Sequence, residues 1–298
     1  MDEVPTVQWE ERSKMKAAPE NKFSDCLQSR DFLIMAHRGF WGGNVIQNTR
    51  QAAILAKRAG ADVIEIDVCR SSDGVYYLFH NENEPALLGM MGRDFSELPA
   101  SLIDQLEYIN SVGDPSGFYP ERLADFLAWL PEDYLVNIDR AWAYFRDDAF
   151  IGLIQDSGKA DQLLFKSQVE AGPLEALNQL DEPLNYMAII QKRDQLAELS
   201  QYDQVRLVGL ELIVKGEAND LVDPDWRQDL LAKNYLLTVN SEKLGKQPHL
   251  YLELSDESAL LSEAGYGDWE DMVQHGSNAF ITDWPNFMAD FRRQRQGM

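Results

Sequence analysis

Residues suited to proton transfer and metal binding recur at five successive strand-like apolar runs between residues 32 and 166. They comprise two imidazoles, three carboxylates and three cations: His37, Arg38, Glu65, Asp67, His80, Asp139, Arg140 and Lys166. In folds built of parallel strands and helices, functional side chains gather at the carboxyl ends of the strands. One polar strand end is ordinary, but five in succession are hard to explain by packing. We therefore treat this set as the candidate site.

The carboxylates of this set have the spacing of a metal site. Glu65 and Asp67 are two residues apart in the run 62–68, so their side chains point to the same face of a strand. A lone pair of this kind is more often a solvated sheet face. Here the neighbours are apolar, namely Val63, Ile64, Ile66 and Val68. With Asp139, the pair can supply oxygen ligands to a hard divalent cation, and we predict Mg²⁺ or Ca²⁺.

His37 and His80 are candidates for general acid–base catalysis, because imidazole exchanges protons near neutral pH. A lone histidine at a strand end is commonly structural, but a pair beside carboxylates makes a catalytic role as credible as a structural one. Arg38 offers a fork suited to phosphate oxygens, and Lys166 offers a point charge. Both cations fit equally well into a structural ion-pair network with the carboxylates, and the sequence leaves that choice open.

Short apolar runs alternate with helical periodicity along the chain. Nine runs are predicted as strands: 32–36, 62–68, 75–79, 134–138, 162–165, 185–190, 207–214, 235–239 and 279–281. Strands that alternate with helices indicate a parallel sheet with outer helices, and we predict an α/β fold of the TIM (β/α)8 barrel type. Since this barrel has eight strands, one of the nine is wrong or lies outside it. An open doubly wound sheet fits the alternation equally well, but no glycine-rich phosphate loop follows the first strand.

The length of 298 residues suits a single barrel. We predict an N-terminal extension, 1–30, followed by one barrel domain, 31–298, with a small loop-rich insertion at about 81–120. No apolar stretch approaches the roughly 18 residues that cross a membrane, so no transmembrane segment is expected.

The chain is strongly acidic, with 50 acidic against 27 basic residues and a formal net charge of −23. This charge repels nucleic-acid backbones and anionic membranes, so no nucleic-acid partner is expected. It also repels phosphate groups, so a phosphate-bearing substrate requires local positive charge from Arg, Lys or a metal. Cys26 and Cys69 are too few for a disulfide framework, which favours a cytoplasmic location. The oligomeric state is not indicated.

Several of these motifs follow one another as in the glycerophosphodiester phosphodiesterases of the PLC-like phosphodiesterase superfamily. The matching segments are His37-Arg38-Gly39, Asn48-Thr49, the stretch 60–68, Asp73-Gly74, His80 and Thr282-Asp283-Trp284-Pro285. The set resembles that family. The resemblance implies a TIM barrel with a small insertion, a divalent metal held by Glu65, Asp67 and a later acidic residue, and two catalytic histidines. It also implies hydrolysis of small-molecule glycerophosphodiesters to glycerol 3-phosphate and an alcohol.

The chain departs from the family pattern at three positions, which makes it a divergent member. The glutamate that usually precedes Asn-Thr is Gln47, and the usual His-Asp becomes His80-Asn81. The usual Glu-x-Lys strand end has the shorter carboxylate Asp139 and lacks the lysine. In such a branch, Lys166 on the next strand is expected to take over the phosphate contact.

Two alternative functions remain open. The first is a phospholipase-D-like lyase of the same superfamily, which forms a cyclic phosphate. The second is a phosphodiester-binding barrel that has lost the reaction, as the three departures suggest.

Trp41, Trp142 and Trp284 fall near predicted strand ends and either line the alcohol side of the pocket or are ordinary core or rim aromatics.

Overall fold

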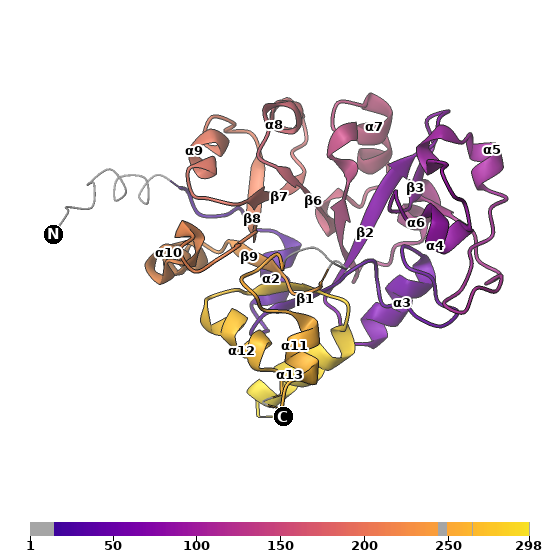
Figure 1. The fold of residues 1–298 in the computed structure, drawn as a ribbon. Helices are drawn as coiled ribbons and strands as arrows, with labels where there is room; N and C mark the ends of the chain where they lie inside the picture. Colours follow the sequence, from indigo (N-terminus) through magenta and orange to yellow (C-terminus); the bar gives the residue numbers. More distant parts are fainter. Residues whose placement is uncertain (1–14, 244–248, 264, 298) are drawn as a thin grey trace. The chain divides into compact units, whose positions relative to one another are not determined.

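Parallel strands alternate with helices along the chain in the computed structural model, which describes residues 15–243, 249–263 and 265–297 (Figure 1). All nine predicted strands are present, as β1 (Leu33–Ala36), β2 (Val63–Arg70), β3 (Tyr76–Leu78), β5 (Leu135–Asp139), β6 (Leu163–Gln168), β7 (Asn185–Ile190), β8 (Arg206–Leu212), β9 (Leu236–Asn240) and β10 (Ala279–Thr282). The predicted TIM (β/α)8 fold class is confirmed. The predicted strand in excess of the eight is β3. It lies outside the barrel and pairs antiparallel with β2.

The chain forms two compact units, which we describe separately. The site unit comprises Leu33–Ser167 and Ile281–Met298, and the second unit comprises Met1–Phe32 and Gln168–Phe280. All the residues of the candidate site belong to the site unit. The domain boundaries expected from the sequence therefore remain a proposal.

In the site unit, β2 lies between β1 and β5, and all three strands are parallel. β5 continues the parallel sheet to β6. The helices of this unit are α3 (Arg50–Arg58), α4 (Glu84–Leu88), α5 (Ala100–Ile103), α6 (Leu123–Trp129), α7 (Asp148–Asp156) and α13 (Pro285–Arg295). Short 3-10 turns are η1 (Phe95–Glu97), η2 (Ala141–Tyr144) and η3 (Ala160–Gln162). The chain order places the helices between the strands, as the apolar periodicity indicated.

Helix α3 begins at Arg50, directly after its capping residue. Its N-cap is Thr49, whose hydroxyl accepts a hydrogen bond from the Ala52 amide at 3.2 Å. Asn48 has a left-handed backbone with φ of 55° and cannot continue a helix. The start of α3 thus leaves Gln47 and Asn48 outside the helix, where both contact the site.

Strand β2 has two halves with different partners. Residues 63–67 pair parallel with β5, and residues 68–70 pair antiparallel with β3. The amide of Phe79 donates to the carbonyl of Asp67 at 3.1 Å, so β3 returns the chain to the middle of β2. This return brings His80 to the part of β2 that carries the two carboxylates.

The segment predicted as a loop-rich insertion has its own apolar core. It contains α4, η1 and α5, and it ends at the two-residue strand β4 (Glu121–Arg122), which the sequence analysis did not predict and which pairs with β3. Buried side chains of the segment pack against β3, among them Phe95 and Tyr108. The rings of Phe79 and Phe95 stack with centroids 4.2 Å apart. Figure 1 shows α4, α5 and α6 around β3.

The second unit contains the parallel strands β7, β8 and β9. Its helices are α2 (Lys22–Leu27), α8 (Ala171–Asn178), α9 (Gln195–Leu199), α10 (Pro224–Ala232), α11 (Asp256–Leu261) and α12 (Gly267–Gln274), with the turn η4 (Asp220–Val222). The described part of the N-terminal extension packs on this unit through the buried Phe23 and a 2.8 Å hydrogen bond from the Ala18 amide to the Lys233 carbonyl. The first 14 residues of the extension lie outside the described residues. None of the helices in the described ranges has both the length and the apolarity that crossing a bilayer requires.

Candidate active site

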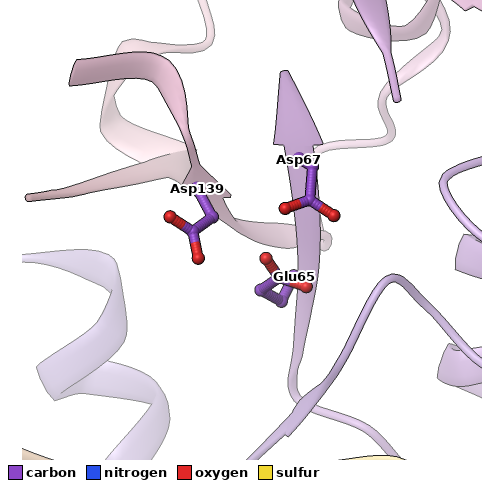
Figure 2. Close-up of side chains that lie close together, drawn as sticks. All are labelled: Glu65, Asp67 and Asp139. Carbon is purple, nitrogen blue, oxygen red and sulfur yellow. The ribbon is translucent and has the colours of Figure 1, made fainter. Parts of the chain in front are cut away.

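The three predicted metal ligands converge. Glu65 and Asp67 project from β2, and Asp139 projects from the end of β5, as Figure 2 shows. One carboxylate oxygen of each lies within 4.8 Å of the other two. The strand register explains this, because Asp67 is paired directly with Asp139 across the sheet and Glu65 lies two residues before Asp67 on the same face.

The electrostatics of this cluster fit a cation. Burial raises the pKa of Glu65 to about 7, and the negative charge of Asp67 contributes to the rise. Burial also opposes ionisation of Asp67, but the charge of Arg38 and a hydrogen bond from Asn48 hold the pKa of Asp67 below its usual value. A carboxylate that retains its proton near neutral pH belongs to a site with too little positive charge. Three hard oxygen donors with this deficit suit a divalent metal ion.

A tight turn after β1 places Arg38 against the carboxylates. Arg38 has a left-handed backbone with φ of 55°, and its amide donates to Glu65 Oε2 at 2.7 Å. Gly39, with φ of 79°, follows against α3, and a Cβ there would lie 2.7 Å from atoms of Ala52. Only glycine fits this approach. The His37-Arg38-Gly39 motif is therefore a turn that directs an amide and a guanidinium toward the predicted metal ligands.

Asn48 and Asp67 hold each other through two hydrogen bonds. The Asn48 side-chain amide donates to Asp67 Oδ2 at 2.9 Å, and the Asp67 backbone amide donates to Asn48 Oδ1, also at 2.9 Å. Both residues are buried. In the sequence, Asn48 stands out only as part of a motif, with no role assigned to it. Its left-handed backbone, which asparagine tolerates better than most residues, is the signal that points to it.

Both predicted phosphate-binding residues are engaged with carboxylates. Arg38 Nε lies 3.1 Å from Asp67 Oδ2, and Arg38 Nη1 donates to Gln47 Oε1 at 2.7 Å. Lys166 Nζ lies 2.9 Å from Asp139 Oδ2, and its side chain is only 4% exposed. Of the two roles left open for these cations, the ion-pair network is therefore present, and phosphate binding remains a prediction.

The three residues that depart from the family pattern each contact a neighbouring residue of the site. Gln47 receives the Arg38 guanidinium as a neutral amide where a glutamate is usual. Asn81 holds His80 through its backbone carbonyl, so the side-chain change leaves this contact intact. The backbone amide of Arg140 donates to Asp139 Oδ1 at 2.6 Å and fixes the shorter carboxylate at the end of β5.

His37 and His80 each have an acceptor at Nδ1. His37 Nδ1 lies 2.8 Å from Asp283 Oδ1, and His80 Nδ1 contacts the Asn81 carbonyl. These acceptors favour a proton on Nδ1, so Nε2 is the atom left to exchange a proton. Asp283 is a site residue that the sequence analysis did not single out, although the Thr-Asp-x-Pro motif contains it. Burial lowers the pKa of His80, and the charges of Arg38 and Arg140 lower it further against the opposing effect of Asp67.

Comparison with known proteins agrees with this geometry. The model of the glycerophosphoryl diester phosphodiesterase family matches residues 37–285. The chain belongs to this family. It is an enzyme of the phosphoric diester hydrolase class, and glycerophosphodiester hydrolysis is the reaction that its family supports. A search of curated proteins found no match.

Solved structures share the fold at low sequence identity. A glycerophosphoryl diester phosphodiesterase from Parabacteroides distasonis is 13% identical, with a TM-score of 0.67 and 94% of each chain covered. A glycerophosphodiester phosphodiesterase from Agrobacterium tumefaciens is 19% identical, with a TM-score of 0.60, covering 87% of this chain and 99% of its own. A phosphodiesterase from Oleispira antarctica, solved with the product sn-glycerol-3-phosphate, is 18% identical, with a TM-score of 0.60 and coverage of 89% and 99%.

Proposed function

We propose that the enzyme hydrolyses glycerophosphodiesters to glycerol 3-phosphate and an alcohol in a reaction that requires Mg²⁺ or Ca²⁺. The observation that carries this proposal is the convergence of three carboxylates within 4.8 Å in a chain of this family. Glu65, Asp67 and Asp139 would hold the metal. When bound, a divalent cation supplies positive charge that stabilises the phosphoryl oxygens as negative charge develops on them.

The side chains around the cluster have separate tasks in this proposal. The Arg38 guanidinium and the Lys166 ammonium orient the phosphate and offset its charge. Because both are engaged with carboxylates, a bound metal would relieve them of that role and leave them to the substrate. Asn48 keeps Asp67 in place through its paired hydrogen bonds.

We assign the two histidines different roles. His80 is half-buried, and its partial burial and the charges of Arg38 and Arg140 lower its pKa, which favours the neutral imidazole that accepts a proton from the attacking water. His37 faces the Asp283 carboxylate, which favours an imidazole able to carry and donate a proton to the leaving alkoxide. In this scheme the water proton moves to His80 Nε2, and His37 Nε2 gives its proton to the alcohol oxygen.

The first experiment measures glycerol 3-phosphate release from glycerophosphocholine and glycerophosphoethanolamine. Reactions contain Mg²⁺, Ca²⁺ or excess EDTA, and a Glu65→Ala, Asp67→Ala double variant serves as the site control. The proposal expects release that needs a metal and disappears in the double variant. If neither Mg²⁺ nor Ca²⁺ supports release of glycerol 3-phosphate, the proposal is overturned.

The two alternatives need different readouts. Phosphorus NMR of the products distinguishes hydrolysis from the lyase reaction, because a persistent cyclic phosphate would assign the enzyme to the lyases. Calorimetry tests the non-catalytic alternative, which predicts poor binding of divalent cations. Cys69 is a buried free thiol whose pKa burial raises to about 12, so the structure gives the lyase no disulfide at this position.

We also propose that residues 31–298 act as one phosphodiesterase domain after an extension of 1–30, which the family match over residues 37–285 supports. The proposed location is the cytoplasm, supported by Cys26 and Cys69, both of which are in the thiol form. Cell fractionation with an antibody to the protein tests the location, and limited proteolysis followed by activity assay tests the domain boundary.

A further inference from the structure

Three tryptophans stand at the ends of strands that carry site residues. Trp41 follows β1, Trp142 follows β5 and Trp284 follows β10. They are 41%, 37% and 42% exposed, respectively. The remaining tryptophans of the described residues are buried or half-buried, namely Trp129, Trp226 and Trp269. Within the described chain, the exposed indoles therefore coincide with the strand ends that form the site.

Each indole is close in sequence to a residue of the site. Trp41 comes three residues after Arg38, Trp142 three residues after Asp139, and Trp284 directly after Asp283. Since β2 lies between β1 and β5, the carboxylates of β2 lie between the strand that leads to Trp41 and the strand that leads to Trp142. We call these three tryptophans the indole rim.

The backbone around the rim is ordered by local hydrogen bonds. The Trp284 amide donates to Thr282 Oγ1 at 3.0 Å, and the Trp284 ring lies 6.1 Å from the Phe287 ring. Trp142 lies within the turn η2, and its carbonyl accepts from the Phe145 amide. These bonds order the backbone that carries Trp142 and Trp284, and the Phe287 ring lies beside the Trp284 indole.

Exposed indole faces recognise either apolar chains or cations, and the charge of the protein decides between them. The formal net charge is −23, so the field around the protein attracts cations and repels anions. The indole face itself attracts ammonium groups, quaternary ammonium among them. The phosphate of the substrate has its own cations in Arg38 and Lys166. The arrangement suits a substrate with a phosphate at one point and a positive charge nearby.

We infer that the indole rim selects phosphodiesters whose alcohol carries an ammonium group, above all a quaternary ammonium alcohol. This inference rests on the proposed phosphodiesterase function and narrows its substrate class. An alcohol of the same shape without charge gains only apolar contact at the rim. An anionic alcohol is repelled by the acidic surface.

The test compares two substrates of equal shape. One is glycerophosphocholine, and the other is the 3,3-dimethylbutyl ester of glycerophosphate, in which carbon replaces the choline nitrogen. We expect kcat/KM to be about tenfold higher for the choline ester, on the scale of a cation–π contact. Trp142→Ala and Trp284→Ala should each lower this ratio severalfold. Trp142→Phe and Trp284→Phe should retain part of the preference for the choline ester. Trp129→Ala is the matched control, because that ring packs against Arg50 and should leave the ratio unchanged.

A ratio near one in the unaltered enzyme, or a ratio that the rim variants do not change, would overturn the inference while the hydrolase function stands. If a lysophospholipid gave the highest kcat/KM, the rim would instead be assigned to binding acyl chains.

Tryptophan fluorescence supplies a readout that needs no turnover. Choline should quench it more strongly than 3,3-dimethylbutanol, and the difference should shrink in the rim variants. If no glycerophosphodiester is hydrolysed, the proposed function fails, and this binding difference still decides the rim.

Discussion

His37 Nδ1 lies 2.8 Å from Asp283 Oδ1, although 246 positions separate the two residues in the sequence. The amide of His37 also donates to the carbonyl of Thr282 at 3.0 Å, so the backbones of β1 and β10 bring the pair together. A carboxylate at Nδ1 fixes the ring orientation and the tautomer of an imidazole. Asp283 is thus placed to position the His37 ring.

The Asp283→Asn variant should therefore lower kcat by about 10- to 100-fold and leave KM nearly unchanged. The amide keeps the shape but removes the charge that favours the protonated imidazole. Steady-state kinetics from about pH 5 to 9, the range in which imidazole titrates, measure both parameters and the shape of the profile. Asp290→Asn on α13 is the control, because Asp290 pairs with Arg293 at the exposed surface. An unchanged kcat in Asp283→Asn would remove Asp283 from the mechanism.

The two histidines should respond differently to the leaving group. His37→Ala and His80→Ala should each lower turnover of glycerophosphocholine by about 10²-fold or more, the usual scale for a lost acid or base. A nitrophenyl ester of glycerophosphate needs no proton on its leaving oxygen. His37→Ala should thus recover most of its activity on that ester, and His80→Ala should not. Recovery in His80→Ala alone would reverse the assignment of the acid and the base. His249, which is not part of the candidate site, supplies the control, and His249→Ala should behave as the unaltered enzyme.

Metal affinity should depend on pH through Glu65. Burial raises the pKa of Glu65 to about 7 in the metal-free protein, so below that pH a metal must displace a proton to bind. The apparent affinity should fall by about tenfold for each pH unit below 7 and level off above it. Calorimetry in buffers of different ionisation enthalpy counts the released proton. Glu65→Gln should bind weakly with no such dependence, and proton release that is absent about one unit below that pKa would contradict the prediction.

Lys166 should stabilise the metal-free site. Lys166→Met leaves the Asp139 carboxylate without its 2.9 Å partner, and we expect a loss of about 1–3 kcal/mol in the free energy of unfolding. The loss is smaller than for a fully buried pair because Asp139 is 23% exposed. Added Mg²⁺ should restore most of it by replacing the missing charge. Thermal melts with EDTA and with Mg²⁺ measure both effects.

Two further variants control this experiment. Lys166→Arg keeps a positive charge and should melt close to the unaltered protein. Lys192→Met breaks a pair with Asp194 in which the side chains are 63% and 65% exposed, so it should change the melting temperature little. Equal destabilisation of Lys166→Met with and without Mg²⁺ would show that the lysine acts only in packing.

The strands are predictable because their apolar runs are short and bounded by polar residues, and β2 shows this most clearly. Its period-two alternation is enough to place Glu65 and Asp67 on one face of a strand. The direction of β3 is not predictable in the same way, since an apolar run does not specify its partner. Only the pairing of Leu78 with Val68 shows that β3 returns along β2 and delivers His80.

The insertion shows a second limit of sequence patterns. Its helices α4 and α5 have five and four residues, too short for the periodicity that identifies a helix. They are stabilised by packing around Phe95 and Tyr108, which are buried against β3. Long-range burial of this kind leaves no local pattern, and the segment therefore reads as loop.

The sequence by itself determined the family, the alternation of strands and helices, and the residue types of the site. These follow from local spacing, because period-two alternation and short motifs are properties of neighbouring residues. Only the tertiary structure decided the partners: Asp283 for His37, Asn48 for Asp67, and Lys166 for Asp139. Each pair joins segments brought together by strand pairing or by the turn before α3. Contacts between distant segments depend on the register of the whole sheet, which no single stretch of sequence contains.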